Sequence, residues 1–146
     1  MSPSNATFVD ALELRAIVLD ECSVKRGDAD HDKPGEVAST ITIEPTYDGN
    51  GKLLTYSINA HHTFNNSEGQ VVVNIDVSMA ALYDVHGELE PSEEEIESFG
   101  STSALVHVTP FFREFLATMT NRLGMPVFYL PMLKVRKARA GKQDAK

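Results

Sequence analysis

Four segments of the chain alternate between apolar and polar residues with a period of two, which is the pattern of half-buried β-strands. They cover about residues 8–24, 36–47, 52–64 and 70–86. The fourth segment is the clearest, because its odd-numbered residues are apolar. Its other face carries Asn74, Asp76, Ser78 and Asp84. We therefore predict four strands, each with one face turned to a core.

In the first of these segments the apolar positions are mostly the even-numbered ones. They predict one continuous apolar face along a strand that starts near Phe8. Its members are Phe8, Leu12, Leu14, Ala16, Val18, Cys22 and Val24. On this face Cys22, the only cysteine, is expected to be a small buried hydrophobic residue and not a nucleophile.

The connections between the segments favour a meander. Asp48–Gly51 and Asn65–Gly69 have the length and composition of hairpin loops, and residues 26–35 form a longer, charged loop between the first two strands. We therefore expect a four-stranded antiparallel meander sheet with one apolar face. Such a face has to be covered by another layer.

The second half of the chain changes to helical spacing. Ser92 and Glu95 have the spacing of a capping box, which predicts a short helix that ends at residues 100–103. A long helix is predicted to start near Thr109 and Pro110. Its apolar stripe consists of Phe111, Phe112, Phe115, Leu116, Met119 and Leu123. The fold class is therefore α+β, a single domain over residues 1–133.

Charge is distributed unevenly along the chain. The net charge is −8, but residues 134–146, the basic tail, hold six basic residues against Asp144 and carry +5. Residues 1–133 therefore carry −13, which argues against nucleic acid as a partner. We expect the basic tail to be disordered and solubilising. The sequence has no apolar run long enough for membrane insertion and no recognisable secretion signal at its start, so we expect a cytoplasmic protein.

The residue patterns that would indicate an enzyme are missing. His61 and His62 are adjacent on a predicted strand, so their side chains point to opposite faces and do not chelate one metal. Residues 28–39 imitate a calcium loop, but Lys33 and Ser39 replace its glycine and glutamate. There is no glycine-rich phosphate loop and no nucleophile elbow. We predict no catalytic residue, metal or cofactor.

The second half of the chain resembles the SecB family of export chaperones. Residues 110–114 (PFFRE) resemble the PYARE-type segment that opens the family's long helix, and residues 126–132 (PVFYLPM) are similar to its P-x-L-x-L-P-P segment. Between them, residues 121–124 (NRLG) resemble its helix-ending turn. Upstream, residues 76–83 (DVSMAALY) resemble its E-V-x-x-x-G-I-F strand. With the order of elements, the resemblance covers about residues 8–133.

This resemblance implies an ATP-independent holdase that binds unfolded or extended polypeptides in hydrophobic grooves. It also implies a homotetramer, a dimer of dimers in which the long helices lie between two eight-stranded sheets. The clients would be proteins destined for export or, because residues 81–99 look closer to SecB-like chaperones of toxin–antitoxin pairs, an antitoxin. Candidate peptide-binding residues are Ile41, Ile43, Tyr56, Val73, Ile75, Val77, Met79, Phe128 and Tyr129. Each of them has a simpler alternative role in the core or at a subunit interface.

The family also presents an acidic patch to the motor ATPase SecA. Glu21 and Asp76 match two of its positions, whereas Lys25 stands at the third, and the basic tail replaces the family's last helix. Two other classes of function stay open. The chain could be a dedicated adaptor that binds one specific partner through the sheet face, or an enzyme of unrecognised type.

Overall fold

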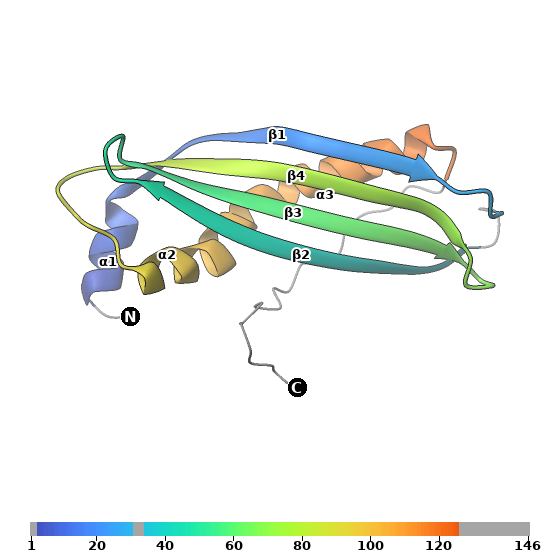
Figure 1. Ribbon diagram of the computed structural model, residues 1–146, viewed down its shortest axis with the longest axis horizontal. Helices are drawn as coiled ribbons and strands as arrows, with labels where there is room; N and C mark the ends of the chain where they lie inside the picture. Colours follow the sequence, from blue (N-terminus) through green and yellow to red (C-terminus); the bar gives the residue numbers. More distant parts are fainter. Residues whose placement is uncertain (1–2, 31–33, 126–146) are drawn as a thin grey trace.

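The computed structural model describes residues 3–30 and 34–125 and shows a four-stranded antiparallel sheet with helices on one side (Figure 1). The fold class predicted from the sequence is confirmed, with one difference in strand order. The elements in chain order are α1 (Pro3–Asp10), β1 (Leu12–Arg26), β2 (Pro34–Asp48), β3 (Leu53–Asn66), β4 (Val71–Val85), α2 (Glu93–Phe99), the π-helical turn η1 (Gly100–Ala104) and α3 (Leu105–Arg122).

The strand order is β1-β4-β3-β2, so only β2, β3 and β4 form a meander. The prediction that β1 lies beside β2 was wrong. A full meander would leave β4, the most regular apolar strand, at an edge of the sheet. The observed order instead pairs β4 with both β1 and β3, and this avoids a long exposed apolar edge.

The course of β1 also differs from the prediction. Phe8 is not on a strand: it lies in α1, where it is buried and its ring packs edge-on against Phe99 with centroids 5.9 Å apart. Two register shifts, between Leu14 and Ala16 and between Leu19 and Glu21, break the alternation of β1 against β4. Each bulge reverses which residues face the core.

The two bulges change the face on which several predicted residues lie. Ile17 and Leu19 pair with buried residues of β4 in place of the predicted Ala16 and Val18, and the second bulge restores the original parity for Cys22 and Val24. Because β1 is an edge strand, this face is only partly covered there. Cys22 is therefore exposed, contrary to the expectation that it is buried.

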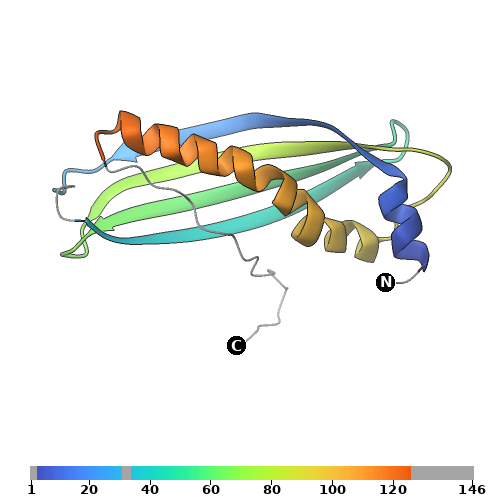
Figure 2. The ribbon, with the colours of Figure 1, turned by 180° about the vertical axis from the view of Figure 1, so that it is seen from behind.

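The helix α3 runs diagonally across one face of the sheet, which we call the covered face (Figure 2). Alternate residues of β3 and β4 point into this layer and make the core with α3. The core residues on these three elements include Leu54, Tyr56, Ile58, Val73, Ile75, Tyr83, Val108, Phe112 and Leu116. The other face, seen in Figure 1, carries no helix within the described part of the chain, and we call it the open face.

The two predicted helices are joined without a break. The predicted capping box of Ser92 and Glu95 is confirmed, but residues 100–104 continue as a π-helical turn where an interruption was expected. Pro110 consequently lies inside α3 and not at its first position. Gly100 makes the close packing of this turn possible, because a Cβ at that position would lie 2.7 Å from Cε1 of Tyr56. Gly124, with φ of +77°, follows the end of α3 as predicted.

Candidate functional site

The covered face gathers most of the predicted peptide-binding residues. Five of them are buried beneath the helical layer: Tyr56, Val73, Ile75, Val77 and Met79. Ile41 and Ile43 lie half-buried on the edge strand β2 and pack against the margin of the same core. Phe128 and Tyr129 lie outside the described residues. Of the described candidates, only the two isoleucines are therefore partly accessible in this chain.

Tyr56 ties the sheet to the helical layer at the turn between α2 and α3. Its hydroxyl donates a hydrogen bond of 2.5 Å to the carbonyl oxygen of Ile96, and burial raises its pKa far above the ordinary value. The neighbouring Tyr83 is hydrogen-bonded through its hydroxyl to Nδ1 of His107 at 2.7 Å, and burial raises the pKa of Tyr83 to about 12. Both phenols are therefore neutral at pH 7, and their hydrogen bonds tie the sheet to the helices.

His62 is the one buried histidine among the described residues. Its Nδ1 is hydrogen-bonded to Oγ of Ser39 at 2.7 Å, while Nε2 has no hydrogen-bond partner within residues 3–30 and 34–125. Burial, and secondarily the charge of His61, lowers the pKa of His62 to about 4. The imidazole is therefore neutral at pH 7, and protonation would place an unsatisfied charge in the core.

Several large apolar side chains are exposed in the single chain. On α3, Val106 is 66% and Phe111 is 48% exposed, and on β1 the exposed residues are Leu14, Val18 and Leu19. Apolar side chains gathered on one helix and one edge strand commonly indicate association. Sequence reasoning placed Leu14, Val18 and Phe111 on the core side. Leu14 faces the core side at the edge strand but is only partly covered there, the first bulge turns Val18 to the open face, and Phe111 lies on a side of α3 that is 48% exposed. None of these causes was visible in the periodicity.

The open face contains a hollow of about 370 Å³ at its centre. Polar side chains from all four strands line it: Glu21, Ser23, Thr40, Thr42, Asn59, His61, Asp76 and Ser78. The structure thus brings together the two predicted acidic-patch residues, since Glu21 pairs with Ser78 and Asp76 pairs with Ser23 across the β1–β4 ladder. Lys25 lies one step further along β1, opposite Asn74.

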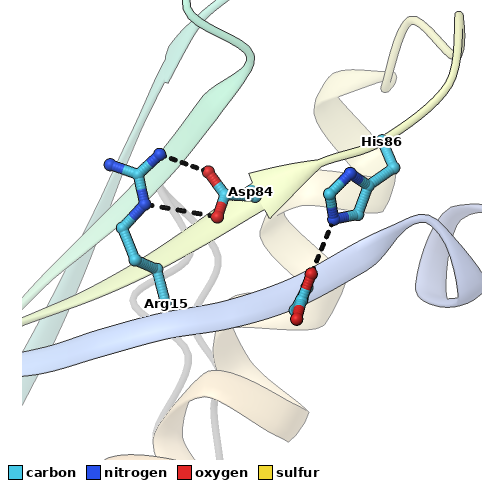
Figure 3. Close-up of polar contacts among 4 residues, drawn as sticks. Arg15, Asp84 and His86 are labelled. Atoms are coloured by element: carbon cyan, nitrogen blue, oxygen red, sulfur yellow. Dashed lines mark hydrogen bonds and ion pairs between the residues drawn. The ribbon is translucent and has the colours of Figure 1, made fainter.

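The carboxylates of the hollow differ from those near the start of β1. There Arg15 donates two hydrogen bonds to Asp84, and His86 contacts Glu13 at 2.8 Å (Figure 3). In the hollow, Asp76 contacts His61, whereas Glu21 has no ion-pair or hydrogen-bond partner among residues 3–30 and 34–125. The hollow therefore offers an unneutralised carboxylate.

No helix in the described residues is long and apolar enough to cross a membrane. No group of three or more histidine, cysteine, aspartate or glutamate side chains is placed there to hold a metal ion.

The chain is similar to known proteins over part of its sequence and over most of its fold. No protein-family model matches the chain. Two curated relatives, the SecB-like chaperones Rv1957 and MT2006 from two strains of Mycobacterium tuberculosis, are each 36% identical over 69 residues. That match covers 45% of this chain and 38% of each relative, so the chain spans less than two fifths of the relatives' length. The solved structure of Rv1957 in complex with a ChAD peptide from the HigA1 antitoxin shares the fold, with a TM-score of 0.76 and 24% identity. The chain is therefore similar in sequence to SecB-like chaperones over part of its length and shares the fold of one of them.

The SecB-like fold extends over almost the whole chain. The superposition with Rv1957 covers 93% of this chain and 100% of the solved one. The resemblance found in the sequence is thereby confirmed. A SecB-like architecture also agrees with the layer of two joined helices on a single face of the sheet.

Proposed function

We propose that this SecB-like chain is an ATP-independent holdase that binds unfolded or extended polypeptide in the cytoplasm and catalyses no reaction. The observation that carries the proposal is the margin of the covered face. Ile41 and Ile43 are half-buried there on an edge strand, beside a core of aromatic and aliphatic residues. An extended client segment would pack its apolar side chains against that surface. Burial of apolar surface contributes roughly 25 cal/mol per Å², whatever the client's sequence.

The other predicted peptide-binding residues fall into two groups with different roles in this proposal. Tyr56, Val73, Ile75, Val77 and Met79 form the apolar floor below the margin and set its shape. Phe128 and Tyr129 follow α3 in the sequence and would complete the groove with flat aromatic side chains, which accommodate varied clients.

The antitoxin of a toxin–antitoxin pair is the favoured client. The solved relative Rv1957 holds a peptide of the HigA1 antitoxin, and it shares the fold of this chain. The alternative clients are proteins destined for export, which would be passed to SecA. This alternative is supported by the acidic-patch residues Glu21 and Asp76, which lie in one hollow. Exposed apolar residues on β1 and α3 support assembly into a homotetramer, a dimer of dimers.

The test is suppression of aggregation of a chemically unfolded, unrelated protein, followed by light scattering without nucleotide. We expect wild-type protein to suppress scattering and the double variant I41D/I43D to lose that activity. The matched control is T40D/T42D, which puts the same charges on the same strand but on the open face. Equal suppression by I41D/I43D and wild type would exclude the margin of β2 as the client site.

A dedicated adaptor is the second candidate function, and the hollow on the open face favours it. A polar hollow lined from all four strands suits a folded partner better than an unfolded chain. A panel of unrelated unfolded clients separates the two functions. A holdase protects most of the panel, whereas an adaptor protects none of it and binds a single partner.

A further inference from the structure

We propose that the hollow of the open face is occupied by the basic tail of the same chain, residues 134–146, so that an external partner has to displace the tail. This inference concerns a surface on the opposite side of the sheet from the proposed client site. It therefore does not depend on the holdase function.

Charge complementarity is the first argument. The tail carries +5, from six basic residues and Asp144, whereas the preceding 133 residues carry −13. On the open face the acids near the start of β1 already have side-chain partners, because Arg15 pairs with Asp84 and His86 contacts Glu13. Glu21 has no such partner in the described part of the chain. The hollow thus offers a carboxylate that is available to a basic segment.

The reach of the chain is the second argument. The last described residues lie next to the end of β1, because Nη1 of Arg26 donates a 2.8 Å hydrogen bond to the carbonyl oxygen of Leu123. Arg26 pairs with Val73, and Asp76 is three residues further along β4, a distance of about 10 Å. From Met125 to Lys134 an extended chain spans up to about 30 Å, enough to pass around the sheet.

The form of the hollow is the third argument. Its lining comes from all four strands, and its hydroxyl and amide groups include those of Ser23, Thr42, Asn59 and Ser78. Lysine and arginine side chains carry only donors, and these groups offer acceptors beside the two carboxylates. Lys25 lies outside the lining and leaves the hollow itself acidic.

The decisive experiment uses a fluorescent 13-residue peptide with the sequence of residues 134–146 and measures its anisotropy on full-length proteins. In the tail variant, Lys134, Arg136, Lys137 and Arg139 are changed to Gln. We expect the peptide to bind the tail variant about tenfold more tightly than wild type, because a tethered segment competes at an effective concentration in the millimolar range. Raising NaCl from about 0.05 M to about 0.5 M should abolish this binding.

Two further variants, both made in the tail-variant background, locate the site. E21Q/D76N should reduce peptide binding to the level of wild type. E94Q/E97Q removes the same number of charges from α2 and should leave binding unchanged. Equal peptide affinity for wild type and the tail variant would overturn the proposal. Equal loss in the two charge-matched variants would also overturn it, since attraction to the whole body would then explain the binding.

Zero-length carbodiimide cross-linking of wild-type protein tests whether the contact is within one chain. We expect cross-links from Glu21 or Asp76 to Lys134 or Lys137, found by mass spectrometry. When isotopically light and heavy protein are mixed unfolded and refolded together, so that oligomers contain both, the cross-links should still be light–light or heavy–heavy. Mixed cross-links would overturn the assignment to the same chain, and the absence of any cross-link to these two acids would overturn the site.

Discussion

The two faces of the sheet are built by alternate residues of the same strands, yet they offer opposite surfaces. On β3, His62 is buried under the helical layer, and its Nε2 has no partner in the described part of the chain. Its neighbour His61 is exposed on the open face and contacts Asp76. The covered face is a continuous apolar core, and the open face is polar and hollowed. One alternating pattern therefore encodes both an apolar layer that stabilises the fold and a separate surface of polar side chains.

The largest expected difference between the faces is in stability. Ile75 is fully buried beneath α3, so Ile75→Ala should lower the free energy of unfolding by about 2–5 kcal/mol through lost burial and a residual cavity. Ser78→Ala, three residues along the same strand on the open face, should change it by less than about 0.5 kcal/mol. Urea unfolding at one fixed protein concentration measures both. Similar losses for the two variants would show that the open face is also covered in solution.

The adjacent histidines His61 and His62 allow the two faces to be compared through the pH dependence of stability. Burial lowers the pKa of His62 to about 4, and its unfolded value is about 6.5. Between these values the unfolded chain binds the proton and the folded chain does not. Stability should therefore fall as pH drops from about 6.5 to about 4 and level off below that, by up to about 3 kcal/mol in total.

The variant H62Q should remove most of this pH dependence, measured as the slope of unfolding free energy against pH. H61Q is the matched control on the open face and should keep it. If both variants retain the wild-type slope between pH 4 and 6.5, the acid sensitivity comes from the carboxylates and not from the buried imidazole.

Periodicity predicted β2, β3 and β4 well because those strands run without internal bulges over most of their length. It failed on β1, where two bulges shift the alternation, and sequence spacing does not show a bulge directly. Strand order was also missed, since hairpin loops identify neighbours only where they are short. The loop after β1 is long enough to allow either partner.

The candidate sites were predictable to different degrees. Family resemblance alone predicted that Glu21 and Asp76 belong to one acidic patch. The structure brings them into one hollow because the second bulge leaves Glu21 on the open face. The burial of Tyr56 and Met79 could not be separated from client contact in the sequence, because an apolar face predicts a core and a groove equally well. Placing α3 over that face required the tertiary structure.

The smallest expected effect lies on the open face, in the ion pair of Arg15 and Asp84. The geometry is bidentate, but the side chains are 52% and 28% exposed, so water and salt screen the attraction. A double-mutant cycle with R15Q and D84N should give a weakly favourable coupling at low salt that disappears at about 0.5 M NaCl. A coupling that persists at high salt would mean that this end of the open face is shielded from solvent. A partner or another segment would then cover the open face at this end as well as at the hollow.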